Sequence, residues 1–171
     1  TNQNPFAMND EELMSFLSEP RFMSCTTMRQ NGTPVVIFLG FEWDGEAMYF
    51  SVRNSRLLIR RLERDPKMVV AITNECAPAK YVVMEGVVEP IEDPDWEITM
   101  RGFMKYLSPK NDFQTQKDIN LDDFLDGYFD VGRTVYRMVP TRITSEDLSK
   151  MLTGAGGAGM NRLDFDGVSV A

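Results

Sequence analysis

The chain has 171 residues and a formal net charge of -8, with 26 acidic side chains, 18 basic side chains and no histidine. This length predicts one domain, and the negative charge argues against general nucleic-acid binding, which needs a dominantly basic surface. Without histidine the chain cannot form a Ser-His-Asp or Cys-His catalytic group or a histidine-ligated haem. Cys25 and Cys76 are too few for a disulfide framework or a zinc site, so no metal is expected.

No apolar run is long enough to span a bilayer, and no signal peptide is visible at the start of the sequence. The sequence therefore predicts a cytoplasmic protein without a membrane segment. Any catalytic chemistry must come from carboxylates, Lys, Tyr, Ser or Cys, or from a bound cofactor.

The first fifty residues alternate β-rich segments with turn signals. Asn9 and Glu12 have capping-box spacing ahead of an apolar run, which predicts the start of a helix. The Asn31-Gly32 pair is a strong hairpin signal, and Asp44-Gly45 predicts a second turn. The predicted elements are a helix over 9–18 and strands over 22–29, 34–42 and 47–52.

The second part of the chain continues this pattern with longer helices between the strands. The predicted elements are helices over 55–65, 93–107 and 121–129 and strands over 67–73, 81–91 and 134–139. Gly86 predicts a bend or bulge inside its strand. Residues 151–171 are glycine-rich and are expected to form a flexible tail.

The order of these elements predicts the fold class. Hairpin turns between neighbouring strands argue against a doubly wound parallel sheet. The sequence instead predicts a mainly β fold, a closed or nearly closed antiparallel β-barrel with peripheral helices, in a single domain over residues 1–150.

An arginine cluster stands out against the acidic background. Five arginines lie within twelve residues, from Arg53 to Arg64, where a strand passes through Asn54 and Ser55 into a helix. A helix N-terminus with a hydroxyl cap and nearby arginines can bind a phosphate group, and a bound anion would relieve the conflict between these cations and the helix dipole. An ordinary solvated helix face is the alternative interpretation.

The run GTPVVIFLGFEWDGEAMYFSVRNSRLLIRRLERDPKMVVAI, followed by YVVMEGVVEPIEDP, resembles the pyridoxamine 5'-phosphate oxidase-like family of flavin-binding split barrels. The similarity covers roughly residues 8–150 and is strongest to the group with flavin or deazaflavin cofactors. It depends on a combination of motifs: Asn31 to Pro34, Asp44-Gly45, the strand-to-helix turn, Leu62 to Pro66, and Glu85-Gly86. The resemblance implies a six-stranded antiparallel FMN-binding split barrel that forms a homodimer with two flavin sites at the subunit interface.

The resemblance also implies where a cofactor would bind. Its phosphate would lie at the turn between the third strand and the helix, and its ring along the second strand; no particular catalytic residue is implied. The implied cofactor-binding residues are Ser51, Arg53, Ser55, Arg56, Arg60, Val36, Ile37, Phe38, Lys80 and Tyr81.

Two positions depart from the family pattern. Leu58 stands where a phosphate-binding lysine is frequent, so either neighbouring arginines compensate or cofactor affinity is reduced. Gly40 stands where a bulky aromatic residue is frequent, which either opens space near the ring or marks a bulge.

The resemblance implies a flavin-dependent oxidoreductase that uses FMN or the deazaflavin coenzyme F420, with a reduced pyridine nucleotide or another compound as donor and a small, hydrophobic acceptor. A non-catalytic dimer that binds flavin or another planar ligand is the alternative. Oxidation of pyridoxamine phosphate is a third interpretation, but the matching C-terminal segment is missing.

Two further groups of acidic residues allow more than one interpretation. Asp122, Asp123, Asp126 and Asp130 could form a cation site, although a solvated helix face explains them more simply. Glu85 is either a buried acid or part of an exterior ion pair.

Overall fold

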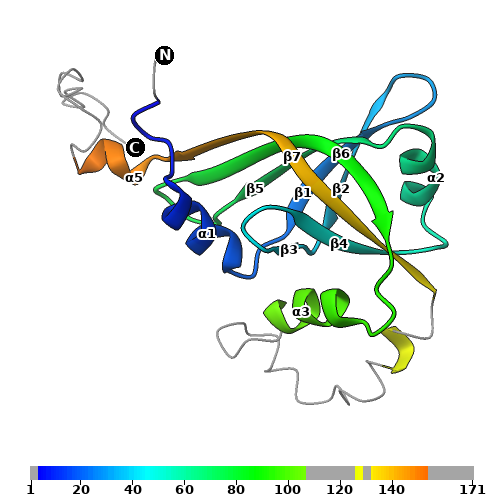
Figure 1. Cartoon of the computed structure of the whole chain (residues 1–171). Coiled ribbons are helices and arrows are strands. Elements are labelled where there is room, and N and C mark those ends of the chain that lie inside the picture. The colour runs from blue at the N-terminus through cyan, green and yellow to red at the C-terminus, as the bar shows by residue number, and fades with distance from the viewer. Residues whose placement is uncertain (1–3, 107–125, 129–131, 154–171) are drawn as a thin grey trace, which may run out of the picture.

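One curled sheet of seven antiparallel strands carries the fold (Figure 1). The structure is a computed structural model, which describes residues 4–106, 126–128 and 132–153. Helices flank the sheet, and α1 and α2 lie near its opposite ends. This architecture confirms the predicted mainly β split-barrel fold.

The elements agree with most of the predicted segments. In chain order they are α1 (Asp10–Ser18), β1 (Met23–Met28), β2 (Pro34–Leu39), β3 (Glu42–Trp43), β4 (Met48–Arg53), α2 (Leu57–Arg64), β5 (Lys67–Thr73), β6 (Lys80–Ile91), α3 (Glu97–Tyr106), β7 (Arg133–Asp147) and α5 (Ser149–Leu152). The prediction had six strands, with a single strand over 34–42. In the structure this segment is divided near Gly40 into β2 and the short β3, which is the seventh strand.

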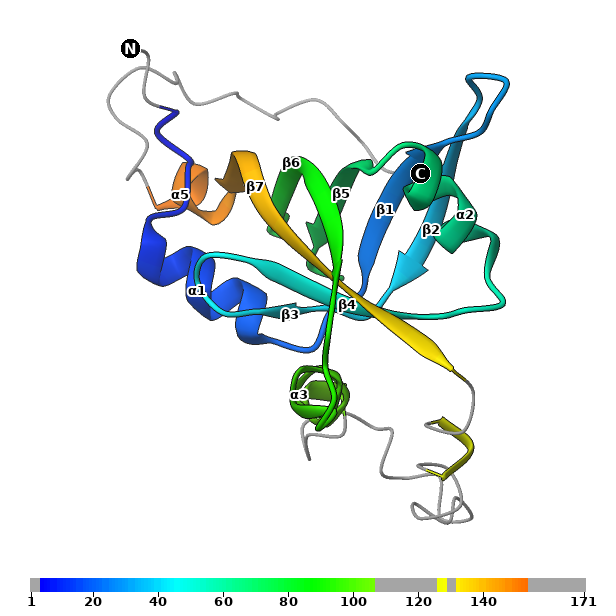
Figure 2. The ribbon, with the colours of Figure 1, turned by 45° about the vertical axis from the view of Figure 1, so that its right-hand side comes forward.

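The strands are ordered β2-β1-β5-β6-β7-β4-β3. The last long strand, β7, pairs with β6 over most of its length and with β4 through its first six residues. Figure 2 shows β7 crossing the molecule and joining the β5–β6 side to the β4–β3 side. β7 therefore holds the two halves of the curled sheet together.

The predicted strand over 134–139 was too short, because β7 continues to Asp147. The prediction stopped before Pro140, since a proline cannot donate a hydrogen bond to a sheet. The structure accommodates Pro140 opposite Gly86, where the β6–β7 register shifts in a bulge. A Cβ atom at Gly86 would come within 2.8 Å of the Met138 side chain, so glycine allows β6 and β7 to approach closely here. The bulge predicted at Gly86 is confirmed.

The inner face of the sheet, together with α1 and α2, encloses a methionine-rich core. Alternate residues of β1 and β4 are buried, as expected for strands with one face toward the core. The fully buried side chains include Leu17 of α1 and the methionines Met23, Met48, Met68, Met84 and Met138. Methionine is flexible and fills irregular gaps, which suits a core lined by strongly curved strands.

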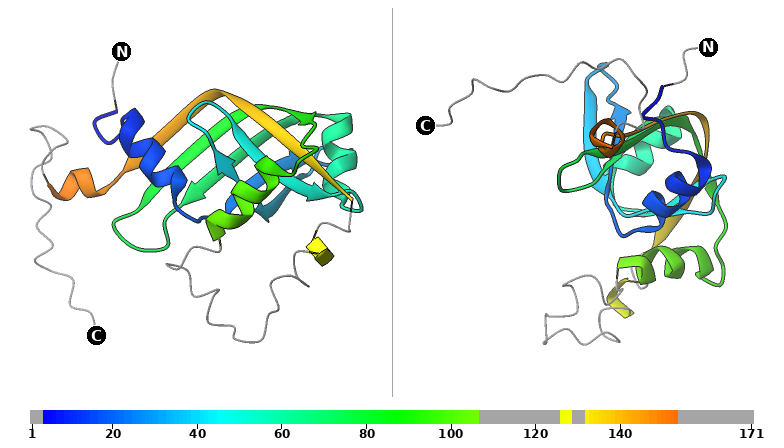
Figure 3. Two further views of the ribbon diagram at one scale, coloured as in Figure 1. Left: turned by 60° about the horizontal axis from the view of Figure 1, so that its bottom comes forward. Right: turned by 90° about the vertical axis from the view of Figure 1, so that its left-hand side faces the viewer.

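α3 lies on the outside of the sheet, against β3 and β4 (Figure 3). Asp93 caps its first turn by accepting hydrogen bonds from the backbone of Ile98 and Thr99 and from the Thr99 hydroxyl. This cap explains why the helix begins at Glu97 and not near residue 93 as predicted. The predicted helix over 121–129 and most of the predicted tail over 151–171 lie outside the described residues.

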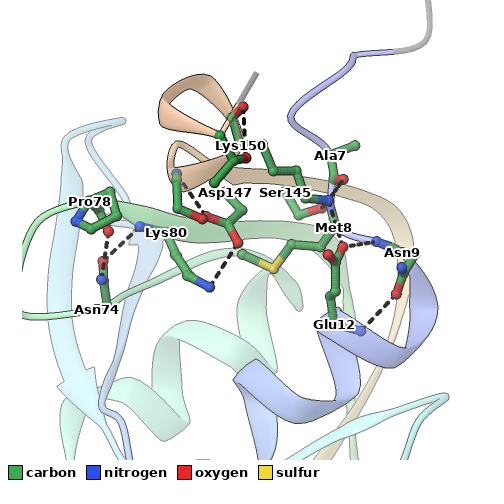
Figure 4. A network of polar contacts seen from close by, with 12 residues as sticks. Ala7, Met8, Asn9, Glu12, Asn74, Pro78, Lys80, Ser145, Asp147 and Lys150 are labelled. Atoms are coloured by element: carbon green, nitrogen blue, oxygen red, sulfur yellow. Dashed lines mark hydrogen bonds and ion pairs between the residues drawn. The ribbon is translucent and has the colours of Figure 1, made fainter. Parts of the chain in front are cut away.

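A polar network closes the end of the barrel near α1 and α5 (Figure 4). The ammonium group of Lys150 lies 2.6 Å from a carboxylate oxygen of Glu12 and 2.7 Å from the carbonyl oxygen of Ala7. The Met8 amide donates to the Ser145 hydroxyl at 3.1 Å. These contacts attach the N-terminal segment and α1 to α5 and to the end of β7. Among the described residues, no helix is long and apolar enough to cross a membrane.

Candidate functional site

A cavity of about 720 Å³ lies between α3 and the outward side of β4, beside the bend that joins β2 to β3. Its wall is largely aromatic and includes Phe22, Phe38, Phe103, Tyr106 and Tyr128. The polar side chains of Ser51 and Arg133 contribute to the same wall. A cavity of this size and composition is typical of sites for small organic molecules.

Tyr106 attaches the last turn of α3 to the barrel. Its hydroxyl group donates to the carbonyl oxygen of Arg21 at 2.6 Å and accepts from the backbone amide of Phe41 at 2.9 Å. Burial raises the pKa of Tyr106 to about 12, so the hydroxyl group stays protonated over the physiological range. The helix that forms one wall of the cavity is therefore fixed by hydrogen bonds at its C-terminal end.

Lys105 makes a second attachment beside Tyr106. Its ammonium group donates to the carbonyl oxygens of Leu17, at 2.6 Å, and Phe41, at 3.3 Å, and lies 3.9 Å from the centroid of the Phe41 ring. Burial lowers the pKa of Lys105 to about 8, although the negative charge of Glu42 acts in the opposite direction. The hydrogen bonds and the ring face compensate for part of the lost hydration.

The close approach of Tyr106 also explains Gly40. A Cβ atom at this position would lie 3.0 Å from the Tyr106 ring, closer than ordinary van der Waals contact. One interpretation of the sequence was that Gly40 opens space near the cofactor ring. The structure contradicts it, because the Tyr106 ring occupies that space. Gly40 therefore lets α3 pack against the bend between β2 and β3.

Arg133, at the start of β7, forms the polar end of the cavity. Its Nε atom donates to the Ser51 hydroxyl at 2.8 Å, and Nη2 donates to the Ser51 carbonyl oxygen at 3.3 Å. The guanidinium carbon lies 4.0 Å from the centroid of the Tyr128 ring. Burial lowers the pKa of Arg133, as do the positive charges of Arg53 and Arg56, whereas Tyr128 raises it. Arg133 therefore lies in a positive environment.

The turn between β4 and α2 differs from the predicted helix N-terminus. α2 begins at Leu57, and its N-cap residue is Arg56, which makes no side-chain capping hydrogen bond. The expected hydroxyl cap is therefore wrong, because Ser55 lies one residue too early. Leu58 is 2% exposed and belongs to the core, so a lysine in its place would not face an external phosphate group in this structure.

The residues predicted to bind a cofactor lie in different parts of the structure. Phe38 and Ser51 line the cavity, and Arg53, Ser55 and Arg56 lie in the exposed segment after Ser51. Arg60 is exposed on α2, Val36 is exposed on β2, and Ile37 packs against the core. The remaining two are Lys80 and Tyr81.

Lys80 and Tyr81 lie at the start of β6, at the end of the barrel near α5 and away from α2 (Figure 1). Lys80 forms an ion pair with Asp147 at 2.8 Å (Figure 4). A hydrogen bond to Glu146 raises the pKa of Tyr81. Within one chain these two residues are thus separated from the arginine-rich turn.

Sequence analysis missed Arg133, Tyr106 and Tyr128. Ser51 and Arg133 are 82 residues apart, and only the strand register brings them together. No local motif marks Arg133, so a prediction would have required the β4–β7 pairing. Tyr106 had a usable signal in Gly40, since a glycine in place of a bulky residue can indicate that another side chain packs there.

The acidic candidates give no metal site in the part of the chain that the structure describes, which contains no suitable group of Cys, Asp and Glu side chains. Asp122, Asp123 and Asp130 lie outside that part. Glu85 is exposed and lies 3.8 Å from Arg142, which agrees with the exterior ion pair.

Comparison with known proteins places this geometry in context. A family model described as pyridoxamine 5'-phosphate oxidase matches residues 9–121. A conserved hypothetical protein from Mycobacterium tuberculosis superposes with a TM-score of 0.71 at 20% identity, covering 94% of this chain and 96% of that chain. An F420 reductase gives a TM-score of 0.58 at 24% identity, covering 76% and 94%.

The haem storage protein HutZ from Vibrio cholerae gives a TM-score of 0.57 at 17% identity, covering 80% of this chain and 93% of that chain. At these identities the structural likenesses show a shared fold. A comparison with curated protein sequences found no match.

Proposed function

The chain belongs to the pyridoxamine 5'-phosphate oxidase family, and on this premise we propose that it is an oxidoreductase that binds FMN or the deazaflavin coenzyme F420 in the cavity beside α3. The observation that carries the proposal is the cavity itself, whose aromatic wall ends at Ser51 and Arg133. One protein that shares the fold is an F420 reductase.

The residues of the cavity fit a flavin-type cofactor. Phe22, Phe38 and Phe103 offer apolar ring surfaces suited to a planar heterocycle, and Arg133 offers donors suited to an anionic group. When bound, the cofactor would supply the hydride or electron transfer. The chain's own residues would bind the ring, orient it and exclude water from one of its faces.

The proposed reaction transfers electrons from a reduced pyridine nucleotide to a small, hydrophobic acceptor in the cytoplasm. The support for the acceptor class is the apolar character of the lining around Ile98, Phe103 and Val135. No described side chain is assigned as an acid or base, because the cofactor carries the chemistry in this proposal.

We further propose that a second copy of the chain covers the outer face of the sheet. Val36, Val69, Val87 and Val139, on four different strands, are each more than 40% exposed on this face. Clustered exposed apolar residues mark interaction surfaces. A homodimer should sediment as one species at micromolar concentration, and Val87→Lys should shift it to monomer. A wild-type protein that remains monomeric would contradict this assembly.

A non-catalytic binder is the second candidate function. The burial of Leu58 favours it, because α2 then lacks the lysine that many family members use for phosphate binding. A haem storage protein shares the fold, so a function without turnover is compatible with this architecture.

Ligand titration followed by reduction separates the two functions. The purified protein would be titrated with FMN, F420 and haem, with fluorescence quenching or absorption as the readout, and then mixed with NADH or NADPH. An oxidoreductase should bind FMN or F420 and show reduction of the bound cofactor that is faster than reduction of the free one. Binding without accelerated reduction supports the non-catalytic candidate, and failure to bind FMN or F420 refutes the flavin proposal.

A further inference from the structure

We propose that Arg133 binds the phosphate group of the cofactor's ribityl chain, in the role that the buried residue 58 of α2 cannot fill. This inference rests on the proposed function and assigns the anchor of the same site. The position of Arg133 in the cavity wall, with Arg53 opposite it on β4, carries it.

Arg133 lies among like charges. Arg53 and Arg133 are direct cross-strand partners in the β4–β7 pair, and Arg56 follows in the next turn. Like charges directly opposite each other destabilise a sheet. Among the described residues, no carboxylate forms an ion pair with any of these three arginines. A bound phosphate group would supply the missing negative charge.

The guanidinium group of Arg133 is held in a defined orientation. Its hydrogen bonds to Ser51 use Nε and one N–H of Nη2, and its guanidinium group lies over the Tyr128 ring. A guanidinium group has five N–H donors, so within the described part of the chain both donors of Nη1 and one of Nη2 remain for a ligand. Arg133 is thus held in place at the cavity wall while keeping the donors that bind phosphate in a bidentate way.

The arginine-bearing segments are fixed to each other. The Asn54 amide donates to the Gly132 carbonyl oxygen at 2.9 Å, and the Thr134 hydroxyl donates to the Asn54 side chain at 2.8 Å. These bonds tie the turn after β4 to the residues on either side of Arg133. The two segments that carry Arg53, Arg56 and Arg133 are therefore fixed before a ligand binds, which lowers the entropic cost of binding an anion between them.

Two cofactors could supply this phosphate: FMN as a monoester and F420 as a diester. Each has a counterpart that lacks the phosphate group, riboflavin for FMN and the corresponding 5-deazariboflavin for F420. Riboflavin differs from FMN only in the phosphate group, so this pair isolates the phosphate contact from the contacts of the ring. The deazaflavin pair differs in the phosphate group and in the acidic tail attached to it, and it tests the two together. The pair that shows the difference identifies the cofactor class.

The test is Arg133→Gln, with affinities for all four compounds measured by fluorescence quenching. The variant should bind FMN, or F420, about 10- to 100-fold more weakly, the range expected for lost hydrogen bonds to a charged group. It should bind the phosphate-free counterpart within about twofold of the wild type. Arg133→Lys, which keeps the charge but not the bidentate geometry, should give an intermediate loss.

Arg29→Gln is the matched control, because it removes one exposed arginine at the β1–β2 hairpin and should leave all four affinities unchanged. A circular dichroism spectrum equal to that of the wild type would confirm that the Arg133 variants are folded. If Arg133→Gln does not fold, the affinities of Arg133→Lys are compared with those of the wild type instead. Equal weakening of the phosphorylated and phosphate-free compounds, or none, would overturn the role of Arg133 and leave the proposed function intact. If the wild type binds none of the four, the proposed function and this inference fail together.

Discussion

Tyr106→Phe tests whether the wall of the cavity depends on one hydroxyl group. This substitution keeps the ring but removes both hydrogen bonds to the barrel, one to the Arg21 carbonyl oxygen and one from the Phe41 amide. An unsatisfied buried polar group costs roughly 1–3 kcal/mol. Because both backbone groups are only partly buried, we expect a total loss of about 2–3 kcal/mol in the free energy of unfolding or of α3 detachment.

The assay is thermal unfolding of the full chain, followed by circular dichroism, with hydrogen exchange of the α3 amides. At about 2–4 °C per kcal/mol for a chain of this size, the melting temperature should fall by roughly 4–12 °C. If α3 detaches before the barrel unfolds, its amides should exchange about 30- to 150-fold faster instead.

Tyr49→Phe is the matched control, because its hydroxyl group donates to Asp44 in an exposed position. Tyr49→Phe should lower the free energy of unfolding by only about 0.5 kcal/mol. A Tyr106→Phe protein with both the melting temperature and the α3 exchange rates of the wild type would show that this hydroxyl group does not hold the helix.

Three further predictions concern single side chains. Because the folded-state pKa of Lys105, about 8, lies below its ordinary value of 10.5, stability should rise with pH by about 1 kcal/mol between pH 8 and 9, and chemical denaturation should show no such rise in Lys105→Met. Burial raises the pKa of Cys25 to about 12, so this thiol lowers the free energy of unfolding as the pH rises, chiefly above pH 9. Leu58→Lys should lower the free energy of unfolding by roughly 3–5 kcal/mol in urea titration without tightening FMN binding, because residue 58 faces the core. Arg56→Ala should weaken FMN binding by about tenfold or more in a quenching titration with little effect on folding; affinity equal to that of the wild type would remove Arg56 from the site.

Much of the fold could be predicted because its signals are local. Alternating buried residues identify β1 and β4, Asn31-Gly32 identifies the first hairpin, and the capping box identifies the start of α1. The Asn9 side chain and the Glu12 side chain make the two reciprocal bonds that this motif predicts. Each signal depends on residues within a few positions of one another.

The missed features depend on partners distant in sequence. Pro140 argues locally against a strand, yet the bulge opposite Gly86 lets β7 continue through it. Arg133 lies at the cavity because β7 pairs with β4. Leu58 does not, because its side chain is buried in the core. Two of the residues predicted to bind a cofactor, Phe38 and Ser51, therefore line the cavity, whereas Arg133 at its charged end could not be predicted from local sequence.

The place of β7 as the last of the described strands in the sequence also has a consequence for folding. Among the described strands, β4 and β3 join the rest of the sheet only through β7, whose residues are synthesised long after theirs. Until β7 emerges from the ribosome, β4 has no partner on that side, and its backbone amide and carbonyl groups form an open edge that could pair with another chain. Closing the sheet also requires contacts of high sequence separation, which slow folding. During synthesis the half-formed barrel therefore depends on its last strand both for completion and for protection from aggregation.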